Sequence, residues 1–285
     1  MFPPSIDPVP DQILQRVTLP AREKPLMDPT DYRSLFDLTG KTAIVTGAGR
    51  GIGLAIADAL SDWGANIVVA ELDSATCSKT VARLTKRGGR ALGVAADITV
   101  LSQLRSVFDQ AEAEFGGFDI LVNNAGISAR IPAERYPDEA FDSMLDLNVT
   151  AVFRGMREAA SRWIEAGRGG NIINLASFAG VVADPMSAPY AASKGAVVQL
   201  TRTCAVEWAP HDIRVNAIGP GYVRTEMTAA TLDTPEAGET IRGKTAIGRA
   251  ARPDEIAPAA VYLASAASTY VTGHILMVDG GWTAL

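Results

Sequence analysis

Short apolar runs rich in β-branched residues alternate with longer amphipathic stretches along most of this chain. Such runs are typical of strands, and the stretches between them have the length of helices. The expected strands span residues 42–46, 66–70, 91–97, 119–126, 171–177, 213–221 and 274–281. Runs such as NIVVA at 66–70 are apolar throughout, as is usual for a strand covered on both faces. The alternation therefore predicts an α/β fold: a single Rossmann-type domain with a doubly wound, parallel sheet of about seven strands.

The stretches between these strands predict the helices. They run from the turn after residue 46 to about Trp63, from a cap at Ser74 to about Arg87, from about Leu101 to Phe115, from about Asp138 to Glu165, from about Tyr190 to Trp208, and from Pro253 to Ala264. Residues 222–250 are predicted to be irregular or partly helical. Ligands of doubly wound sheets bind beyond the carboxyl ends of the strands, so the residues that follow each strand are the candidates for a site.

The N-terminal segment differs from the rest of the chain. Residues 1–30 hold seven of the 16 prolines, and proline fixes φ and removes a hydrogen-bond donor, which disfavours helices and central strands. A disordered tail and a segment lying on a neighbouring surface both fit this composition. We expect an arm over residues 1–37, in which Leu35 and Phe36 pack against the body, followed by one domain over 38–285.

Composition and charge exclude several classes of protein. The net charge of −6 provides no basic surface for nucleic acid. No apolar run approaches the ~20 residues needed to span a membrane, and we see no secretory signal at the N-terminus. The two cysteines, Cys77 and Cys204, and the two histidines, His211 and His274, lack the spacing of a metal site, so no metal is predicted. A cytoplasmic protein with buried, idle thiols is expected.

A glycine-rich turn, TGAGRGIG at 46–53, follows the first expected strand. Gly47, Gly51 and Gly53 have the spacing G-x-x-x-G-x-G, which matches neither the commoner dinucleotide fingerprint nor the P-loop. Glycines at a helix N-terminus let the backbone approach a pyrophosphate, although a tight turn without a ligand has the same pattern. The turn, with Arg50 and Ile52 in it, is a candidate nucleotide site.

An acidic residue, Glu71, stands 18 residues beyond Gly53 at the end of the second expected strand. A carboxylate in this position can accept hydrogen bonds from both ribose hydroxyls of an adenosine and would repel the 2′-phosphate of NADP. Arg50 argues in the opposite direction, because a cation in the glycine turn could bind that phosphate. We weigh Glu71 above Arg50 and expect NAD, with NADP possible.

Three further strand ends carry candidate cofactor contacts. Asp97 and Ile98 end the third strand, where an acid can reach an adenine amino group. Asn124, Ala125 and Gly126 end the fourth, where small residues suit close packing against a ribose. Pro220, Gly221, Val223 and Thr225 follow the sixth, where backbone groups and a hydroxyl can hold a carboxamide.

Acid/base chemistry is indicated by Ser177, Tyr190 and Lys194. Tyr190 and Lys194 are four residues apart on a helix and so project from one face. A lysine cation beside a tyrosine lowers the tyrosine pKa from about 10, which would suit it for proton transfer near neutral pH. Ser177 can hydrogen-bond the oxygen that gains or loses the proton. Asn148, in an apolar helical stretch, is either a core or kink residue or a group placed near Lys194.

Taken together and in this order, TGAGRGIG, NNAG at 123–126, Asn148, Ser177, Tyr190-x-x-x-Lys194 and Pro220-Gly221 resemble the short-chain dehydrogenase/reductase family. The resemblance covers residue 38 to the C-terminus. It implies a catalytic tetrad of Asn148, Ser177, Tyr190 and Lys194, an NAD(P) cofactor that Tyr190 and Lys194 also contact, and a homotetramer. Ala176 stands where the family more often has a second serine, with little expected effect.

The resemblance is strongest to polyol (galactitol-type) dehydrogenases and related carbonyl reductases. It implies hydride transfer between NAD and the carbinol or carbonyl carbon of a secondary alcohol, with a polyol or sugar slightly favoured. Candidate substrate contacts lie at 128–131, 183–186 and 222–250, including Ser128 and Asp184. The alternatives are an NADPH-dependent carbonyl or 3-oxoacyl reductase and a non-catalytic nucleotide sensor. An acyl-carrier substrate would need a concentrated basic patch, whereas Arg154, Arg157, Arg162 and Arg168 are spread out.

Overall fold

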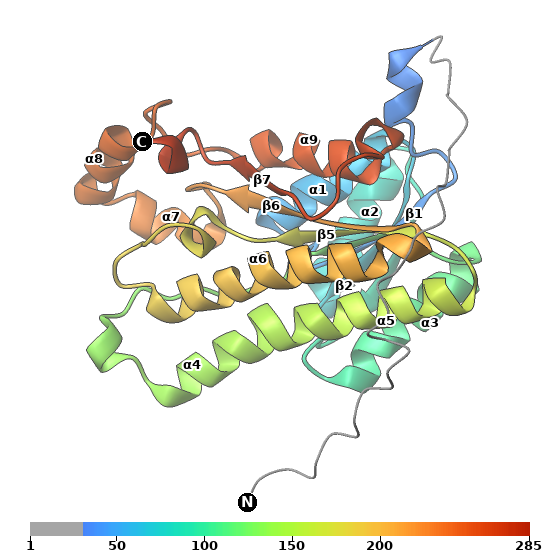
Figure 1. The fold of residues 1–285 in the computed structure, drawn as a ribbon, viewed down its shortest axis with the longest axis horizontal. Helices are drawn as coiled ribbons and strands as arrows, with labels where there is room; N and C mark the ends of the chain where they lie inside the picture. Colours follow the sequence, from blue (N-terminus) through green and yellow to red (C-terminus); the bar gives the residue numbers. More distant parts are fainter. Residues whose placement is uncertain (1–30) are drawn as a thin grey trace, which may run out of the picture. The chain divides into compact units, whose positions relative to one another are not determined.

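The computed structural model describes residues 31–285, in which seven parallel strands form one sheet in the order β3-β2-β1-β4-β5-β6-β7 (Figure 1). The strands are β1 (Thr42–Thr46), β2 (Asn66–Glu71), β3 (Ala91–Ala95), β4 (Ile120–Asn123), β5 (Gly170–Leu175), β6 (Ile213–Pro220) and β7 (Ile275–Val278). The chain moves outward from β1 to β3 and then returns to the other side of β1 at β4. This reversal creates a crevice at the carboxyl ends of β1 and β4. The predicted fold class is confirmed.

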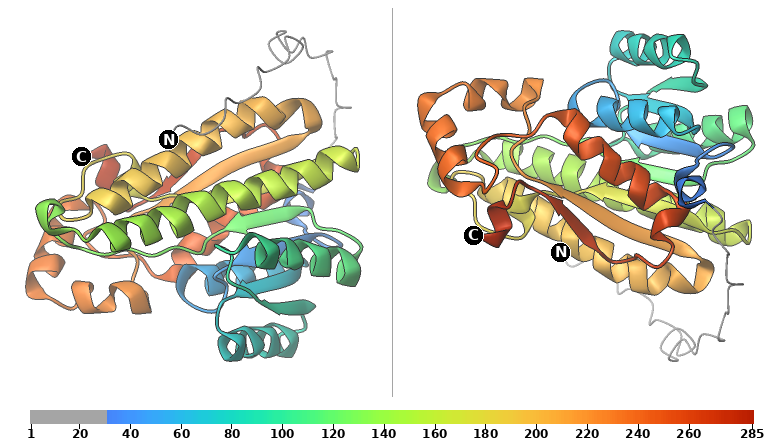
Figure 2. Two further views of the ribbon diagram at one scale, coloured as in Figure 1. Left: turned by 90° about the horizontal axis from the view of Figure 1, so that it is seen from below. Right: turned by 90° about the horizontal axis from the view of Figure 1, so that it is seen from above.

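The sheet is buried on both faces, because successive residues of each strand point to opposite sides. In β1, Ile44 belongs to the apolar layer that includes side chains of α3 (Leu101–Phe115), α5 (Val152–Glu165) and α6 (Ala188–Trp208). Ala43 and Val45 belong to the opposite layer, with side chains of α1 (Gly51–Asp62), α2 (Ser74–Lys86) and α9 (Pro253–Ala264). Figure 2 shows the long helices α5 and α6 side by side on one face of the sheet. Two apolar layers therefore hold the central strands, which explains their uninterrupted apolar sequences.

Several predicted strands end earlier than expected. Strand β3 stops at Ala95, β4 at Asn123 and β5 at Leu175, so the residues that follow them leave the sheet as loops. Ser177 is two residues beyond β5 and caps a short 3-10 turn, Phe178–Gly180, by accepting a hydrogen bond from the Ala179 amide. The chemistry-bearing residues thus stand outside the ladder, where their polar groups can face a ligand.

The helices match their predicted ranges with three corrections. The cap of α2 is Asp73 rather than Ser74, because the Asp73 carboxylate accepts hydrogen bonds from the amide and hydroxyl of Thr76. The stretch predicted as one helix over 138–165 divides into α4 (Asp138–Leu145), a π-helical segment (Asp146–Ala151) and α5. Helix α6 begins at Ala188, two residues before Tyr190, with Pro189 in its first turn, where proline is tolerated.

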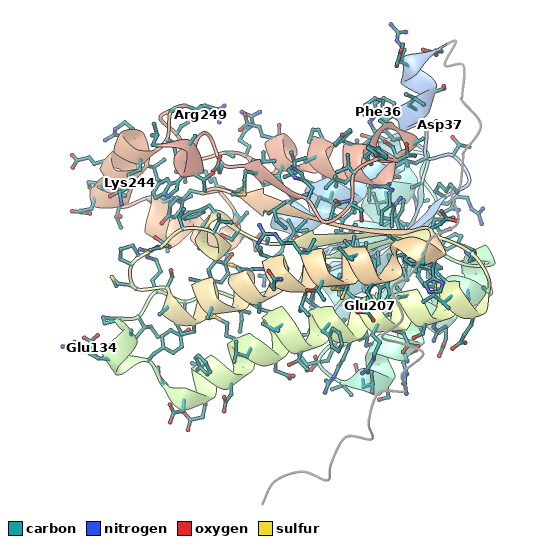
Figure 3. The ribbon with its side chains drawn as sticks, in the orientation of Figure 1. Phe36, Asp37, Glu134, Glu207, Lys244 and Arg249 are labelled. Atoms are coloured by element: carbon teal, nitrogen blue, oxygen red, sulfur yellow. The ribbon has the colours of Figure 1, made fainter. Side chains whose placement is uncertain are left out.

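The segment 222–250 is partly helical, as predicted, with α7 (Glu226–Leu232) and α8 (Pro235–Lys244). The ammonium of Lys244, labelled on α8 in Figure 3, lies 5.5 Å from the ring centroid of Trp282 near the C-terminus. Within residues 31–285, no helix has both the length and the apolar character needed to cross a bilayer.

The lead-in to the domain packs on it through Phe36. Residues Tyr32–Phe36 form a 3-10 turn capped by Asp31, and the ring of Phe36 lies 5.9 Å from that of Trp63 at the end of α1 (Figure 3). Leu35 is half-buried. The arm predicted over 1–37 falls, for residues 1–30, outside the described residues.

Candidate active site

A cavity of about 780 Å³ opens at the carboxyl ends of the strands. It brings together residues from every strand end singled out in the sequence: Gly47, Arg50, Gly51, Ile52, Gly53, Glu71, Asp97, Ile98, Asn124, Ala125, Gly126, Ser177, Tyr190, Lys194, Pro220, Gly221, Val223 and Thr225. Asn148 is the one predicted site residue that does not line it, and its side chain is fully buried. The volume suits a ligand larger than a simple alcohol.

The glycine turn is shaped for close approach of another group. Gly47 and Gly51 have φ of +62° and +55°, in the region that favours glycine. A Cβ on Gly53 would lie 2.2 Å from the Gly47 carbonyl oxygen, which shows how tightly α1 joins β1. Because α1 begins at Gly51, its unpaired amides point to the cavity, as a pyrophosphate site requires. The turn therefore fits a dinucleotide.

The Glu71 carboxylate is fixed at the edge of this turn. Its Oε2 accepts a hydrogen bond from the Gly49 amide, and its Oε1 accepts one from the Leu72 amide, both at 2.9 Å. Arg50 is directed elsewhere: its guanidinium lies 3.5 Å from Glu226 of α7, and both side chains are largely exposed, at 70% and 75%. The carboxylate is thus held in place, whereas the cation is held loosely.

The NNAG segment supports the glycine turn. The Asn124 side-chain amide donates to the carbonyl oxygens of Thr46 and Gly47, at 2.9 and 3.0 Å, and the Thr46 hydroxyl accepts from the Asn124 and Ala125 amides. The Asn124 side-chain amide therefore serves the turn itself, while Ala125 and Gly126 leave room in the cavity.

Two further strand ends complete the wall of the cavity. Asp97 accepts hydrogen bonds from the amide and hydroxyl of Thr99, which orient its carboxylate. After β6, Gly221 passes so close to Asp279 that a Cβ would lie 2.8 Å from its backbone. The methyl group of Thr225 faces Gly51, since a Cβ on that glycine would lie 3.3 Å from it. The segment after Pro220 therefore packs directly against the glycine turn.

Lys194 is a buried cation. Its side chain is 5% exposed, and its Nζ donates a 2.7 Å hydrogen bond to the Leu175 carbonyl oxygen at the end of β5. The same nitrogen lies 5.7 Å from the ring centroid of Tyr190, so the four-residue spacing does bring the two groups together. Burial lowers the pKa of Lys194 to about 8.

The pKa of Tyr190 is raised above its ordinary value of 10, mainly because burial disfavours the phenolate. A hydrogen bond with Ser177 opposes this effect, whereas the charges of Asp184 and Tyr222 add to it. The pKa of Tyr190 is therefore raised, where the sequence predicts a lowered one, because burial outweighs the opposing hydrogen bond with Ser177.

Asn148 lies in the π-helical segment and joins two parts of the site. Its Oδ1 accepts from the Ile127 amide at 2.9 Å, and its Nδ2 donates to the Ile127 carbonyl oxygen and to the Ser193 hydroxyl. Ser193 in turn donates to the Tyr190 carbonyl oxygen at 2.7 Å. The sequence did not single out Ser193, although it stands next to Lys194. A Cβ on Gly126 would lie 3.0 Å from Asn148 Oδ1 and 3.7 Å from Lys194 Nζ, so this glycine lies close to both groups.

Beyond Tyr190, the cavity is lined by a polar cluster that the sequence revealed only in part. Arg130 and Asp184 stand in the predicted substrate segments 128–131 and 183–186, and Tyr222 opens the segment 222–250. Ser187 was not predicted, because an isolated serine carries no pattern. Three aromatic rings pack against one another at this end of the cavity, with centroids 5.0 to 5.2 Å apart: Phe178, Tyr222 and Trp282.

The two cysteines do not line this cavity. Cys77 and Cys204 are free and buried, as expected. Across residues 31–285, no three histidine, cysteine, aspartate or glutamate side chains come together as a group that could hold a metal ion.

Comparison with known proteins agrees with this geometry. A family model described as enoyl-(acyl carrier protein) reductase matches residues 47–283. A 3beta-hydroxysteroid dehydrogenase 1 of Eggerthella lenta is 40% identical over 87% of this chain and 95% of its own length. A galactitol 2-dehydrogenase (L-tagatose-forming) of Cereibacter sphaeroides is 42% identical over 89% of this chain and 99% of its own.

Solved structures show the same fold. A short-chain type dehydrogenase/reductase from Mycobacterium marinum superposes with a TM-score of 0.85 at 40% identity, covering 89% of this chain and 99% of that one. A gluconate 5-dehydrogenase from Burkholderia cenocepacia, in complex with NADP and tartrate, gives a TM-score of 0.85 at 38% identity, covering 88% and 98%.

Proposed function

The chain belongs to the short-chain dehydrogenase/reductase family of NAD(P)-dependent oxidoreductases, and on that premise we propose that it oxidises a secondary alcohol of polyol or sugar type with NAD, reversibly. The observation that carries this proposal is the meeting of Ser177, Tyr190 and Lys194 in the cavity that the glycine turn also lines. When bound, NAD supplies the acceptor for the hydride that leaves the carbinol carbon.

The substrate hydroxyl would bind between Ser177 and Tyr190, which line the same cavity and are near enough for Ser177 to lower the pKa of Tyr190. Tyr190, as the phenolate, would take the hydroxyl proton. An ammonium 5.7 Å from its ring centroid favours the phenolate, and Lys194 is protonated below about pH 8. Lys194 would also hold the nicotinamide ribose. Ser177 would keep the reacting oxygen in place throughout.

Asn148 would act by positioning. It holds the backbone of Ile127 after the NNAG segment and, through Ser193, the first turns of α6, which carry Tyr190 and Lys194. These bonds fix the distance between the two walls of the site. The further proposal that Asn148 steadies Lys194 through a water molecule is compatible with its place beside Gly126.

The preference for NAD is supported by Glu71. Two backbone amides hold its carboxylate beside the glycine turn, where it would accept hydrogen bonds from the adenosine ribose and repel a 2′-phosphate. An NADPH-dependent carbonyl or 3-oxoacyl reductase is the second candidate. It is favoured by Arg50 at the mouth of the cavity and by the NADP found in the related gluconate 5-dehydrogenase.

We also propose a cytoplasmic homotetramer. Support comes from large apolar side chains that remain exposed on the two long helices, among them Phe153 and Ile164 on α5 and Val206 on α6. Exposed apolar side chains on neighbouring helices are often covered by another subunit. Light scattering measures the subunit number directly.

The experiment that tests the catalytic assignment compares the wild-type protein with the Tyr190→Phe variant. Initial rates would be measured with NAD or NADP against polyols, sugars and simple secondary alcohols. The wild type is expected to favour NAD with a polyol, and the variant to lose at least about a hundredfold in turnover while binding NAD nearly as well. Retained turnover would contradict the role of Tyr190, and a preference for NADP would favour the second candidate.

A further inference from the structure

Four side chains form a closed hydrogen-bonded cluster at the substrate end of the cavity: Arg130, Asp184, Ser187 and Tyr222. Asp184 Oδ2 accepts from Arg130 Nη1 at 2.9 Å, and the Ser187 hydroxyl donates to the Asp184 carbonyl oxygen at 2.6 Å while lying 3.1 Å from Oδ2. Asp184 Oδ1 accepts from the Tyr222 hydroxyl at 3.2 Å, and that hydroxyl also accepts from Arg130 Nη1 at 3.0 Å. The cluster pairs one positive with one negative charge, so its own net charge is zero.

The cluster is held rigidly by the two loops that carry it. Arg130 Nη2 donates to the Pro185 carbonyl oxygen at 2.9 Å, and the Ile131 amide donates to the Met186 carbonyl oxygen at the same distance. The Asp184 side chain is only 9% exposed, and that of Arg130 is 33% exposed. Polar groups fixed in advance by such contacts bind a ligand with little ordering cost.

The cluster still offers both donors and acceptors to a ligand. A guanidinium carries five N–H donors, of which the contacts above use three. Each carboxylate oxygen of Asp184 can accept more than one hydrogen bond. All three of Arg130, Asp184 and Tyr222 line the cavity that Ser177 and Tyr190 also line. Moreover, the charge of Asp184 reaches Tyr190, since it raises the pKa of that residue. Tyr190 and Tyr222 also pack against the same apolar group of Phe178, Ala179 and Trp282, so the cluster lies at the Tyr190 end of the cavity.

We propose that Arg130, Asp184 and Tyr222 bind a second hydroxyl group of an uncharged polyol, and that the same cluster disfavours sugar acids. This inference rests on the proposed function and deepens it. A hydroxyl can donate to Asp184 and accept from Arg130 at once, without disturbing their pairing. A carboxylate can only accept, so it would compete with Asp184 for Arg130 and leave two negative charges side by side.

The first test measures kcat/KM of the wild-type protein with NAD for matched alcohols. Galactitol is compared with D-gluconate, and 2,3-butanediol with 2-butanol, which lacks the second hydroxyl. We expect each neutral compound with the additional hydroxyl to exceed its counterpart by at least about tenfold. D-gluconate matching or exceeding galactitol, or 2-butanol matching the diol, would overturn the inference.

The second test uses Asp184→Asn, which keeps the size of the side chain and removes its charge. We expect galactitol kcat/KM to fall at least about tenfold more than that of 2-butanol, and the ratio of D-gluconate to galactitol to rise. Glu134→Gln is the matched control, because it also replaces a carboxylate with an amide and the Glu134 side chain is 73% exposed. Equal losses on all alcohols, or the same change in the control, would refute the role of Asp184.

Binding gives a readout that does not depend on turnover. Thermal unfolding of the wild type with NADH present should shift upward with galactitol and less with equimolar D-gluconate. The absence of this difference would also count against the inference. If the proposed function itself is wrong, no alcohol would be oxidised with either cofactor, a result that differs from each of the outcomes that would overturn the inference about the cluster. Thermal unfolding of each variant without ligands shows whether it is folded.

Discussion

Replacing Lys194 with methionine should stabilise the folded protein relative to wild type at neutral pH and lose this advantage in alkali. Burial lowers the pKa of Lys194 from 10.5 to about 8, and each pH unit of that interval corresponds to about 1.4 kcal/mol. The buried charge therefore costs on the order of 3 kcal/mol below pH 8. Removing the ammonium also leaves the Leu175 carbonyl oxygen without its 2.7 Å hydrogen bond, which costs about 1–3 kcal/mol.

The dependence on pH separates these two contributions. Between about pH 8 and 10.5, the unfolded chain keeps a proton on this lysine that the folded chain has lost, so the stability of the wild type rises with pH. Methionine does not titrate. Lys194→Met should thus be at least as stable as wild type at pH 7, and its stability relative to wild type should fall by about 2 kcal/mol between pH 7 and pH 10.

The measurement is urea unfolding at both pH values, followed by tryptophan fluorescence. Lys79→Met, at an exposed position on α2, is the control and should change its stability relative to wild type by less than about 0.5 kcal/mol between the two pH values. If Lys194→Met behaves like this control, then the lysine is not a destabilising buried cation and the reasoning fails. The variant should also lack alcohol oxidation, which would show a residue kept for function at the expense of stability.

Two further changes test the cofactor side of the cavity. Glu71→Ala should raise the ratio of kcat/KM with NADP to that with NAD by about tenfold or more, because a carboxylate that would repel the 2′-phosphate is lost; an unchanged ratio would remove Glu71 from the ribose site. Gly53→Ala should destabilise the protein by about 1–3 kcal/mol in thermal unfolding, since its Cβ would lie 2.2 Å from the Gly47 carbonyl oxygen. Gly243→Ala in α8, where a Cβ meets nothing within 4 Å, should instead be neutral or stabilising, and equal effects of the two would contradict the packing argument.

The fold could be predicted from sequence because its signals are local. Apolar β-branched runs identified all seven strands, and the observed limits of α3 and α9 agree with the predicted ones. Helix α3 ends at Phe115 and is followed by Gly116, whose φ of +75° suits a helix cap, and α9 begins at Pro253. The π-helical segment at Asp146–Ala151 was missed, because one wider turn inside a continuous helix leaves the polar and apolar pattern nearly unchanged.

The site was predictable where its residues fall in short motifs and not where they meet across the chain. The glycine turn and the Tyr190–Lys194 pair are each a few residues long. Arg130 meets Asp184 from 54 positions away and Tyr222 from 92. No periodicity links such residues, since the three loops come together only when β4, β5 and β6 lie in one sheet. Asp184 was proposed by name, whereas Arg130 and Tyr222 were proposed only as parts of their segments.

The charge state of the site depends on this three-dimensional packing as well. The four-residue spacing brings Lys194 near Tyr190, as the sequence predicts, yet the same packing removes water from both groups. Desolvation then raises the pKa of the phenol and lowers that of the ammonium, so each group is pushed toward its neutral form. Alcohol oxidation needs the phenolate and the ammonium, a pair that forms from the neutral phenol and amine when one proton moves from Tyr190 to Lys194. The contact of Ser177 with Tyr190 opposes this tendency, which gives the serine an electrostatic task in addition to binding the substrate oxygen.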